Sequence, residues 1–417
     1  MTDLNPCRVL LINQSYVPDR GASGRLLGEL FERLSVHGIH ATVVAGPPTY
    51  TDEDIPWEPH EVSDKLTVFR VGSARFRGRK SLLNRLIGYM SFVVAAFARA
   101  THLARTREFD VIATASNPPI VGLIGAWCSR VARVPFVYML HDLHPDMVVK
   151  TGRFHVPRFV QAFWNRLNEV IFAGATTIVV LGDSMRTYLV EHKGVPGDKI
   201  VVIHPWAVPE ALAGPKTNAY RLENELGPDQ LMVLYFGNIS STHALGTLIN
   251  AAAILADRPV QFHLVGGGPE KDELQAKCRE MGLVNVSFVP YQSGQRFLDI
   301  MAAADVSVTS LSPGLEGLAV PSKTYAIMAS GRPVLALCSE DCEVASIVRA
   351  AGCGWVCQTP DDVVRAVNEA LDNRALLVCY GDRARAWYME HFSMERATSQ
   401  YLSVFVDTAR HSSTIKD

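Results

Sequence analysis

Residues 8–45 read RVLLINQSYVPDRGASGRLLGELFERLSVHGIHATVVA, and this stretch decides the fold class. The apolar run at residues 8–13 stops abruptly, which indicates a buried parallel strand. A glycine-bearing loop follows, and apolar residues then recur at helical spacing over residues 25–37 until Gly38. A second short strand occupies residues 41–45. Strand, loop, helix and strand form a βαβ unit, so the sequence predicts a right-handed crossover and a parallel sheet.

The same alternation continues along the chain and predicts two domains. Residues 1–204 are expected to form a doubly wound α/β domain, and the proline-rich residues 205–228 a linker. A second series of short strands predicts another such domain at residues 229–382, followed by a C-terminal helical segment at residues 383–417. Two Rossmann-like halves in series place a ligand in the central cleft between them, at the carboxyl ends of the strands.

Composition limits the class of protein. The chain has 417 residues, of which 48% are hydrophobic and 20% charged, which excludes a long disordered protein and suits two domains. A net charge of −2 argues against a general nucleic-acid-binding role. The N-terminus does not resemble a secretory signal and the eight cysteines are scattered, so we predict a cytoplasmic protein. Two cysteine pairs, Cys338 with Cys342 and Cys353 with Cys357, leave a zinc site open as an alternative to buried thiols.

Two glycine loops follow predicted strands and open helices. The first contains Gly21 and Gly24, and the second begins at Gly237 and Asn238. Exposed backbone N–H groups and the positive end of a helix suit such loops to phosphate or to another polar ligand. Neither loop has the dinucleotide-binding or Walker pattern, so NAD and ATP have no direct support. Simple turn formation is the alternative for either loop taken alone.

Two further segments carry candidate chemistry. Residues 141–146, His-Asp-Leu-His-Pro-Asp, directly follow a predicted strand, where an imidazole and a carboxylate are plausible ligands or acid–base groups. A hydrogen-bonded surface histidine and a metal site formed by His141, His144 and Asp146 are the alternatives. Residues 312–333 combine Glu316 with the group Pro-Ser-Lys that ends at Lys323. Lys323 adds a cation where a diphosphate could dock.

Taken together and in order, these motifs resemble the family 4 glycosyltransferases, which have the GT-B fold. The closest likeness is to the bacterial branch that builds surface polysaccharides such as colanic acid and O-antigen. The similarity covers nearly the whole chain. It rests on YVPDRGAS at residues 16–23, HDLHPD at 141–146, VLGDSM at 180–185, YFGN at 235–238, LVGGGP at 264–269, EG at 316–317 and MASGRP at 328–333.

The resemblance implies a hexosyltransferase-type enzyme that moves a sugar from a nucleotide diphosphate donor with retained anomeric configuration. Glu316 matches the first glutamate of the family's paired-glutamate motif, and His141 matches the first-domain position near the donor sugar. With Lys323 they are the predicted catalytic residues. The predicted donor-binding residues are Gly21, Ala22, Gly237, Asn238, Gly266, Tyr291, Pro321 and Ser322.

Two features of the family are missing from this sequence. The second glutamate falls on Thr324 or on Ala326, depending on whether it is counted from the preceding proline or from the following methionine. The basic pair after the Gly-Asn loop is replaced by Ser-Ser-Thr-His at residues 240–243. We expect Lys323 to supply part of the missing positive charge, and N–H dipoles to supply the rest without a metal or a cofactor.

A basic, amphipathic stretch indicates a membrane partner. Five basic residues precede the apolar residues 86–98 and two follow them: Arg75, Arg77, Arg79, Lys80 and Arg85, then Arg99 and Arg105. The apolar run alone is too short to span a bilayer. It suits peripheral contact with the inner face of the plasma membrane and a lipid-linked acceptor. A core helix with a solvated basic face is the alternative.

Other functions remain open on the same residues. A glycosyltransferase with a soluble natural-product acceptor keeps the chemistry and changes the acceptor. A nucleotide-sugar epimerase would need no acceptor. A phosphorylase would need inorganic phosphate. A non-catalytic nucleotide-sugar-binding protein is compatible with the missing glutamate.

Overall fold

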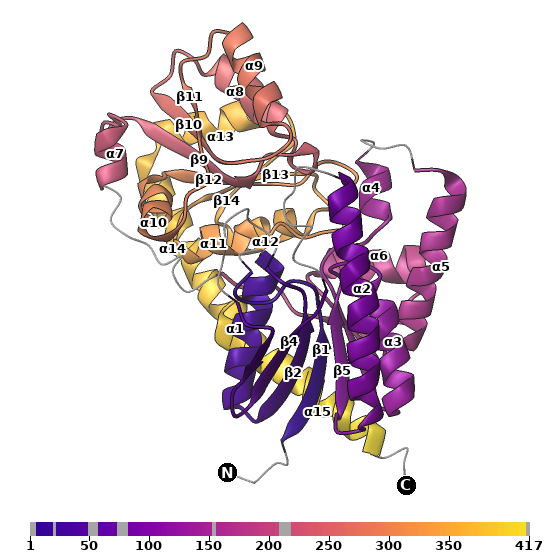
Figure 1. Cartoon of the computed structure of the whole chain (residues 1–417). Coiled ribbons are helices and arrows are strands. Elements are labelled where there is room, and N and C mark those ends of the chain that lie inside the picture. Colours follow the sequence, from indigo (N-terminus) through magenta and orange to yellow (C-terminus); the bar gives the residue numbers. More distant parts are fainter. Residues whose placement is uncertain are drawn as a thin grey trace.

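The computed structural model describes residues 6–19, 22–48, 57–72, 82–151, 156–207 and 218–413. These residues form two α/β domains, each with a central sheet between layers of helices (Figure 1). The prediction of two Rossmann-like, doubly wound domains is therefore confirmed.

The first sheet has eight strands in the order β3-β4-β2-β1-β5-β6-β7-β8. Every neighbouring pair is parallel except β3 with β4. Because β1 lies between β2 and β5, the order reverses there and leaves a crevice at the strand ends. The strands are β1 (Cys7–Ile12), β2 (Ile39–Ala45), β3 (His60–Val62), β4 (Leu66–Arg70), β5 (Val111–Ala115), β6 (Phe136–Leu140), β7 (Thr177–Val180) and β8 (Ile200–Val202).

The second sheet has six parallel strands in the order β11-β10-β9-β12-β13-β14. Its order reverses at β9, so the crevice lies between the ends of β9 and β12. The strands are β9 (Leu231–Asn238), β10 (Val260–Gly267), β11 (Val286–Val289), β12 (Val306–Ser310), β13 (Val334–Leu337) and β14 (Gly354–Cys357). The central strands are buried along most of their length, as expected for strands covered on both faces.

Helices connect the strands and cover both sheets. In the first domain they are α1 (Ala22–Val36), α2 (Leu82–Arg105), α3 (Val121–Ala132), α4 (Asp146–Lys150), α5 (Arg158–Gly174) and α6 (Asp183–Lys193). In the remaining chain they are α7 (Ala219–Glu223), α8 (Leu245–Ile254), α9 (Lys271–Glu280), α10 (Gly294–Ala303), α11 (Lys323–Ala329), α12 (Glu343–Ala351), α13 (Pro360–Asp372), α14 (Arg374–His391) and α15 (Met394–Ser413).

The described residues 218–228 of the expected linker pack against the second domain, whereas Trp206 lies in the apolar cluster of the first domain. Residues 218–228 contain α7, whose Arg221 is buried and forms an ion pair with Asp305 at 3.1 Å. The same guanidinium donates hydrogen bonds to the carbonyl oxygens of Ala303, Gly227 and Gln230. This buried arginine ties the segment to the start of β12.

The last two helices link the domains. Helix α14 packs against α11 in the second domain, and α15 then crosses to the first domain and lies against β1 and β5 (Figure 1). Tyr401 and Phe405 of α15 are buried in the same apolar cluster as Phe31 of α1 and Leu11 of β1. The core of the first domain is therefore completed by α15.

Helix α2 is longer than the apolar run in the sequence suggested. It continues through Arg99 to Arg105, and its residues 87–105, with a mean hydropathy of 1.2, are long and apolar enough to cross a membrane by length and composition alone. The expectation that no segment reaches that length is corrected on this point. One side of the helix lies in the core of the first domain, where Phe92, Ala96 and Ala100 are buried.

Candidate active site

A backbone hydrogen bond joins the two catalytic segments that the sequence predicted. The N–H of Leu143 in the first domain donates to the carbonyl of Leu318 in the second at 3.0 Å. Leu143 lies two residues after His141, and Leu318 lies two residues after Glu316. The structure thus brings the segments of His141 and Glu316 together between the domains, after β6 and β12, where the sequence predicts the cleft.

His141 is held by the end of the neighbouring strand. Ser116 follows β5, and its hydroxyl accepts hydrogen bonds from the backbone N–H groups of His141 at 3.0 Å and Asp142 at 3.3 Å. Burial lowers the pKa of His141, against an opposing effect of the Asp142 carboxylate. The ring is therefore neutral at neutral pH and suited to hydrogen bonding with a polar ligand. Ser116 was not predicted from the sequence, where its only signal is its position at a strand end.

Asp146 is engaged away from the two histidines of its segment. Its carboxylate forms an ion pair with Lys193 at 2.7 Å and accepts a hydrogen bond from the Tyr188 hydroxyl at 3.0 Å. Burial lowers the pKa of His144. The carboxylate thus anchors α4 to α6, which does not favour the alternative of a metal site formed by His141, His144 and Asp146.

Glu316 is oriented by a residue that the sequence analysis did not identify. The hydroxyl of Ser339, which follows β13, donates a hydrogen bond to Glu316 Oε1. Glu316 is half-buried and lies in the loop between β12 and α11. A charge-assisted hydrogen bond of this kind fixes the carboxylate rotamer.

Lys323 contacts the glycine loop after β9. Its ammonium donates to the Tyr235 hydroxyl at 2.7 Å and lies 4.1 Å from the centre of the Tyr235 ring. A Cβ on Gly237, which has a φ of +116°, would lie 3.6 Å from Lys323 Nζ. Burial lowers the pKa of Lys323 to about 7. Among the described residues no carboxylate forms an ion pair with this lysine, so its positive charge is available to an anionic ligand.

The loop after Gly237 is tied together by polar contacts. The Tyr235 hydroxyl donates to the Asn238 carbonyl at 2.6 Å, and the exposed Asn238 side chain donates to the Ser240 hydroxyl at 3.1 Å. His243 lies 3.0 Å from the Ser310 carbonyl through Nδ1, and burial lowers its pKa to about 3. The histidine at the position of the family's basic pair is therefore uncharged and does not replace the missing cations.

The other predicted donor-side residues are spread around this loop. Gly266 pairs with Gly237 across β9 and β10, and a Cβ on Gly266 would lie 2.0 Å from the Gly237 carbonyl oxygen, so only glycine allows this approach. Tyr291 is exposed after the edge strand β11, Ser322 is exposed before α11 and Pro321 is buried. Ala22 begins α1. Gly21 lies outside the described residues.

Neither candidate position for the missing second glutamate presents a polar group to the cleft. Thr324 is fully buried, and its hydroxyl lies 2.9 Å from that of Thr309 on β12. Ala326 is half-buried and apolar. The Thr324 side chain thus belongs to the core beneath the site.

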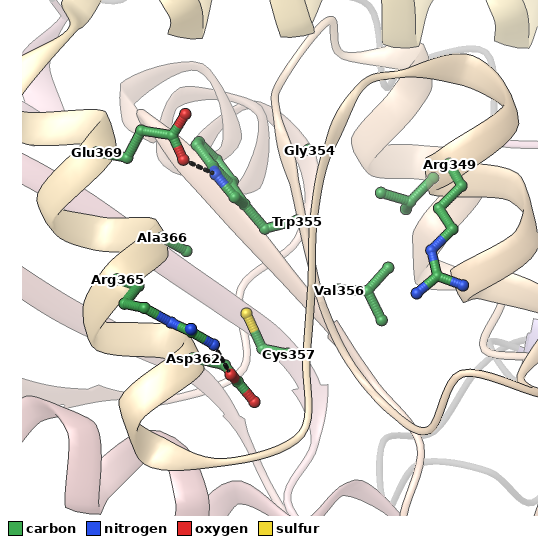
Figure 2. A pocket seen from close by; sticks show the side chains of 10 residues that line it. Arg349, Gly354, Trp355, Val356, Cys357, Asp362, Arg365, Ala366 and Glu369 are labelled. Carbon is green, nitrogen blue, oxygen red and sulfur yellow. Dashed lines mark hydrogen bonds and ion pairs between the residues drawn. The ribbon is translucent and has the colours of Figure 1, made fainter.

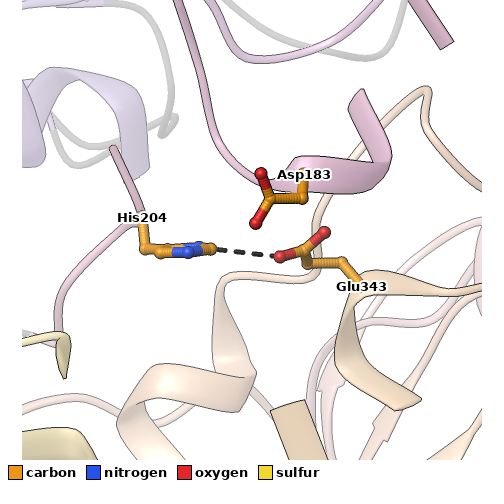
Figure 3. A group of neighbouring side chains, drawn as sticks. All are labelled: Asp183, His204 and Glu343. Carbon is orange, nitrogen blue, oxygen red and sulfur yellow. Dashed lines mark ion pairs between the residues drawn. The ribbon is translucent and has the colours of Figure 1, made fainter. Parts of the chain in front are cut away.

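A second interdomain contact lies beside the cleft. Asp183, His204 and Glu343 bring their ligand atoms within 4.8 Å of one another, a spacing that a metal ion could bridge (Figure 3). However, Glu343 Oε2 accepts a hydrogen bond from the Ser184 N–H at 2.8 Å, and His204 Nδ1 lies 3.1 Å from the Leu181 carbonyl. Because both groups have protein partners, we interpret this group as a junction between the domains.

Two features of the second domain lie away from the cleft. A cavity of about 460 Å³ follows the edge strand β14, and its polar groups are already paired, Arg365 with Asp362 and Trp355 with Glu369 (Figure 2). The cysteines considered for zinc are all buried with free thiols: Cys338, Cys342, Cys353 and Cys357. They lie at the ends of β13 and β14 or beside them, where a small apolar side chain packs well.

Comparisons with known proteins agree with this architecture. Residues 21–206 match the model of the family "Glycosyl transferase 4-like domain", and residues 230–373 match that of "Glycosyl transferases group 1". WbjE of Pseudomonas aeruginosa, which is named as a glycosyltransferase, is 24% identical over 332 residues, covering 79% of this chain and 81% of WbjE.

Two further proteins are similar over nearly their full length. WcaI of Escherichia coli K12, named as a glycosyl transferase of colanic acid biosynthesis, is 24% identical over 417 residues, covering 95% of this chain and 99% of WcaI. The structure of HepE from Anabaena in complex with UDP superposes with a TM-score of 0.71 at 18% identity, covering 96% of this chain and all of that one. With these matches, the chain belongs to the family 4 glycosyltransferases with the GT-B fold.

Proposed function

We propose that the protein transfers a hexose from a nucleotide diphosphate donor to a lipid-linked acceptor, with retention of the anomeric configuration, in the synthesis of a bacterial surface polysaccharide. The observation that carries the proposal is the Leu143–Leu318 hydrogen bond, which brings the segments of His141 and Glu316 to one cleft. A catalyst that must hold a donor and an acceptor between two domains needs such a junction.

The donor diphosphate is assigned to the loop after β9. Lys323 lies against Gly237 without a carboxylate partner among the described residues, and the positive φ of Gly237 leaves the backbone open to close approach. A diphosphate there gains a charge-assisted contact with the ammonium and with backbone N–H groups. The UDP complex of HepE, a protein of the same fold, supports a nucleotide at such a site.

The chemistry follows from where charge develops. The bond between the anomeric carbon and the phosphate oxygen breaks, and its electron pair stays on the phosphate. The acceptor hydroxyl oxygen bonds to the anomeric carbon on the same face, and its proton passes to the departing phosphate. Lys323 stabilises the negative charge that builds up on the diphosphate. This assignment requires no resident metal ion or cofactor.

Glu316 and His141 are assigned to the donor sugar. The carboxylate, fixed by Ser339, accepts hydrogen bonds from sugar hydroxyls, and the neutral imidazole of His141 hydrogen-bonds on the opposite side of the cleft. Placing both groups against one ring restricts the position of the anomeric carbon, which raises the rate by proximity.

The acceptor and the location are inferred from the relatives and from the first domain. WcaI is named for colanic acid biosynthesis, and WbjE as a glycosyltransferase. The first domain, which carries the acceptor side of the cleft, exposes apolar side chains on α2. Both observations favour a lipid-linked saccharide and a location at the inner face of the plasma membrane.

The test measures donor binding and transfer separately. UDP-, GDP- and dTDP-hexoses are first screened for thermal stabilisation of the chain, since a ligand of the folded state raises the unfolding temperature. The stabilising donor is then incubated with lipid-linked saccharides, and nucleotide release and product anomer are measured. Lys323→Ala is expected to weaken donor binding, whereas the exposed Lys65→Ala serves as the control.

Each alternative has its own outcome in this assay. An inverted product would overturn the retaining mechanism, and unchanged donor affinity in Lys323→Ala would overturn the role of Lys323. Stabilisation without nucleotide release would indicate a binding protein. Transfer only to soluble acceptors would overturn the lipid-linked assignment, and conversion of the donor sugar without an acceptor would indicate an epimerase.

A further inference from the structure

Exposed apolar side chains form a stripe along α2. Ile87, Met90, Val94 and Phe97 follow one another at spacings of three, four and three residues, which places them on one face of the helix. All four are exposed, Val94 to 65%. The side with Phe92 and Ala96 is buried in the core, so α2 lies on the domain with an uncovered apolar face.

Two neighbouring helices extend this surface. On α3, Trp127 is 45% exposed, and its ring centre lies 6.0 Å from that of Phe97. On α5, Phe159, Phe163 and Val170 follow at spacings of four and seven residues, with Phe159 75% exposed. Helices α2 and α5 both pack against α3, and the three run side by side along one flank of the first domain (Figure 1).

The charges on the same three helices are almost all positive. Their sequences contain six arginines and one acidic residue, Glu169, which forms an ion pair with Arg166. Six positive charges and one negative charge give +5, in a chain whose net charge is −2. The arginines are Arg85, Arg99, Arg105, Arg130, Arg158 and Arg166.

We propose that this three-helix face, formed by α2, α3 and α5, rests on an anionic lipid bilayer. The apolar side chains enter the boundary between headgroups and acyl chains, and the arginines contact lipid phosphates. Because one side of α2 is part of the domain core, the helix lies on the bilayer and does not cross it. The proposal deepens the proposed function, since it brings a lipid-linked acceptor to the acceptor domain, but vesicle binding does not depend on catalysis.

The charge pattern favours a bilayer over a second copy of the chain. A symmetric dimer through this face would bring the same surface into contact with itself, and so would place its exposed arginines, Arg105, Arg130, Arg158 and Arg166, against the same arginines of the other copy. An anionic bilayer neutralises these charges and accepts the apolar residues at once. The face is also linked to the His141 segment, because the chain continues from that segment through α4 into α5.

The three-helix face differs from the basic stretch that the sequence indicated as the membrane contact. Arg75, Arg77, Arg79 and Lys80 lie outside the described residues, as does the side chain of Arg85. Arg99 lies over the Phe69 ring at 3.9 Å, so it packs against the domain itself. The exposed positive charge of the three-helix face comes instead from the ends of α2 and α3 and from α5, where Arg105, Arg130 and Arg158 are exposed.

The experiment is co-sedimentation of the full chain with vesicles of phosphatidylcholine alone or mixed with phosphatidylglycerol, without donor. We expect binding only to the anionic vesicles, and a decrease as salt is added. Changing Arg105, Arg130 and Arg158 to Gln should reduce the partition coefficient on the order of 100-fold, because each arginine near an anionic surface contributes about fivefold. The corresponding triple change to Lys should retain binding.

The apolar contribution is tested in a second variant. Met90→Ser, Val94→Ser and Phe163→Ser together should lower binding at least tenfold, by about the transfer free energy of the lost side chains. The control is Val284→Ser with Val378→Ser, which removes, from outside the three-helix face, apolar residues that are at least as exposed. Thermal unfolding and donor-induced stabilisation of each variant show that its fold and its donor site are intact.

Three outcomes would overturn the proposal. These are absence of wild-type binding to anionic vesicles, equal binding by the serine variant of the face, and a dimer in light scattering that the same substitutions dissociate. Transfer activity is measured separately. A chain that binds vesicles and transfers no sugar would contradict the proposed function and leave the membrane face standing.

Discussion

Glu343 of the second domain caps a helix of the first: its Oε2 accepts a hydrogen bond from the backbone N–H of Ser184 in α6 at 2.8 Å. The carboxylate is buried, and His204 Nδ1 lies 3.8 Å from its other oxygen (Figure 3). A carboxylate at the first turn of a helix satisfies a free N–H group and interacts favourably with the helix dipole. The contact therefore holds the second domain against the N-terminal end of α6 and restricts the relative orientation of the two domains.

Removing this carboxylate should loosen the junction. We expect Glu343→Ala to lower the free energy of unfolding by about 1–2 kcal/mol, as for the loss of a helix cap. Because the lost contact joins two domains, the radius of gyration in small-angle X-ray scattering should also rise. The exposed Glu340→Ala is the control and should stay within about 0.5 kcal/mol of the wild type. An unchanged radius would show that the contact does not hold the domains together.

Gly182 makes room for the same carboxylate. A Cβ at this position would lie 2.5 Å from Glu343 Cδ, while the backbone itself is extended and suits any residue. Gly182→Ala should therefore cost about 1–3 kcal/mol through overpacking, measured by urea denaturation. In Glu343→Ala the same change should cost much less, because the clashing side chain is gone. Equal costs in both backgrounds would contradict the assigned clash.

Donor affinity should depend on pH through Lys323. Burial lowers the pKa of its amine to about 7, and a bound diphosphate would raise that pKa by attracting the charged form. Binding above pH 7 therefore takes up a proton, so affinity for UDP should fall as pH rises above about 7, by at most about tenfold per pH unit. The pKa of His141 and that of His243 are both lowered, so neither ring gains a charge in this range.

Two variants separate this effect from general changes with pH. Lys323→Arg keeps a positive charge at all these pH values and should bind UDP with little pH dependence. Lys323→Met should bind weakly throughout. Isothermal titration calorimetry in buffers of different ionisation enthalpy measures the proton uptake directly, and equal uptake in the wild type and Lys323→Met would refute the assignment.

Ser339 should act on catalysis through Glu316. Its hydroxyl donates to the carboxylate, and a hydrogen bond to a charged group contributes about 1.5–3 kcal/mol. We expect Ser339→Ala to lower kcat about tenfold or more with a small change in KM for the donor, while Ser339→Thr restores activity. Steady-state kinetics with the stabilising donor measures both constants. A loss of thermal stability with unchanged kcat would instead indicate a purely structural role.

Thr324 should matter for stability and not for donor binding. Replacing it by Val leaves the buried Thr309 hydroxyl without its partner, at a cost of about 1–3 kcal/mol. Replacing both threonines by Val removes the pair together and should recover most of that loss. The UDP dissociation constant, measured by calorimetry, should not change in either variant. A weaker UDP complex would place Thr324 in the nucleotide site.

The sequence predicted what local patterns encode and missed what tertiary contacts create. The βαβ unit of residues 8–45 and the glycine loop at Gly237 follow from short-range spacing, and both are present. Strands β3 and β4 were missed because they are short and lie next to a proline-rich polar stretch. Residues 218–228 looked like a linker, since nothing local shows that Arg221 pairs with a residue 84 positions later.

The residues of the candidate site also fall into those that the sequence predicted and those that it did not. Glu316, His141 and Lys323 stand out in the sequence because they are titratable residues in segments that follow predicted strands. Ser339 and Glu343 were missed, because each acts on a residue that is distant in sequence. Glu343 contacts a backbone group 159 residues away. Only the three-dimensional arrangement of the two sheets makes such a pair visible.

The return of α15 to the first domain has a consequence for biosynthesis. Tyr401 and Phe405 complete a cluster that begins at Val9, so the ribosome must synthesise the chain from Val9 to Phe405 before that cluster can close. The rest of the first domain is synthesised well before α15 and exposes this apolar surface until α15 has been synthesised, which is a period in which a nascent chain aggregates or recruits chaperones. Truncation before α15 therefore yields an incomplete first domain, although the second domain can already be assembled.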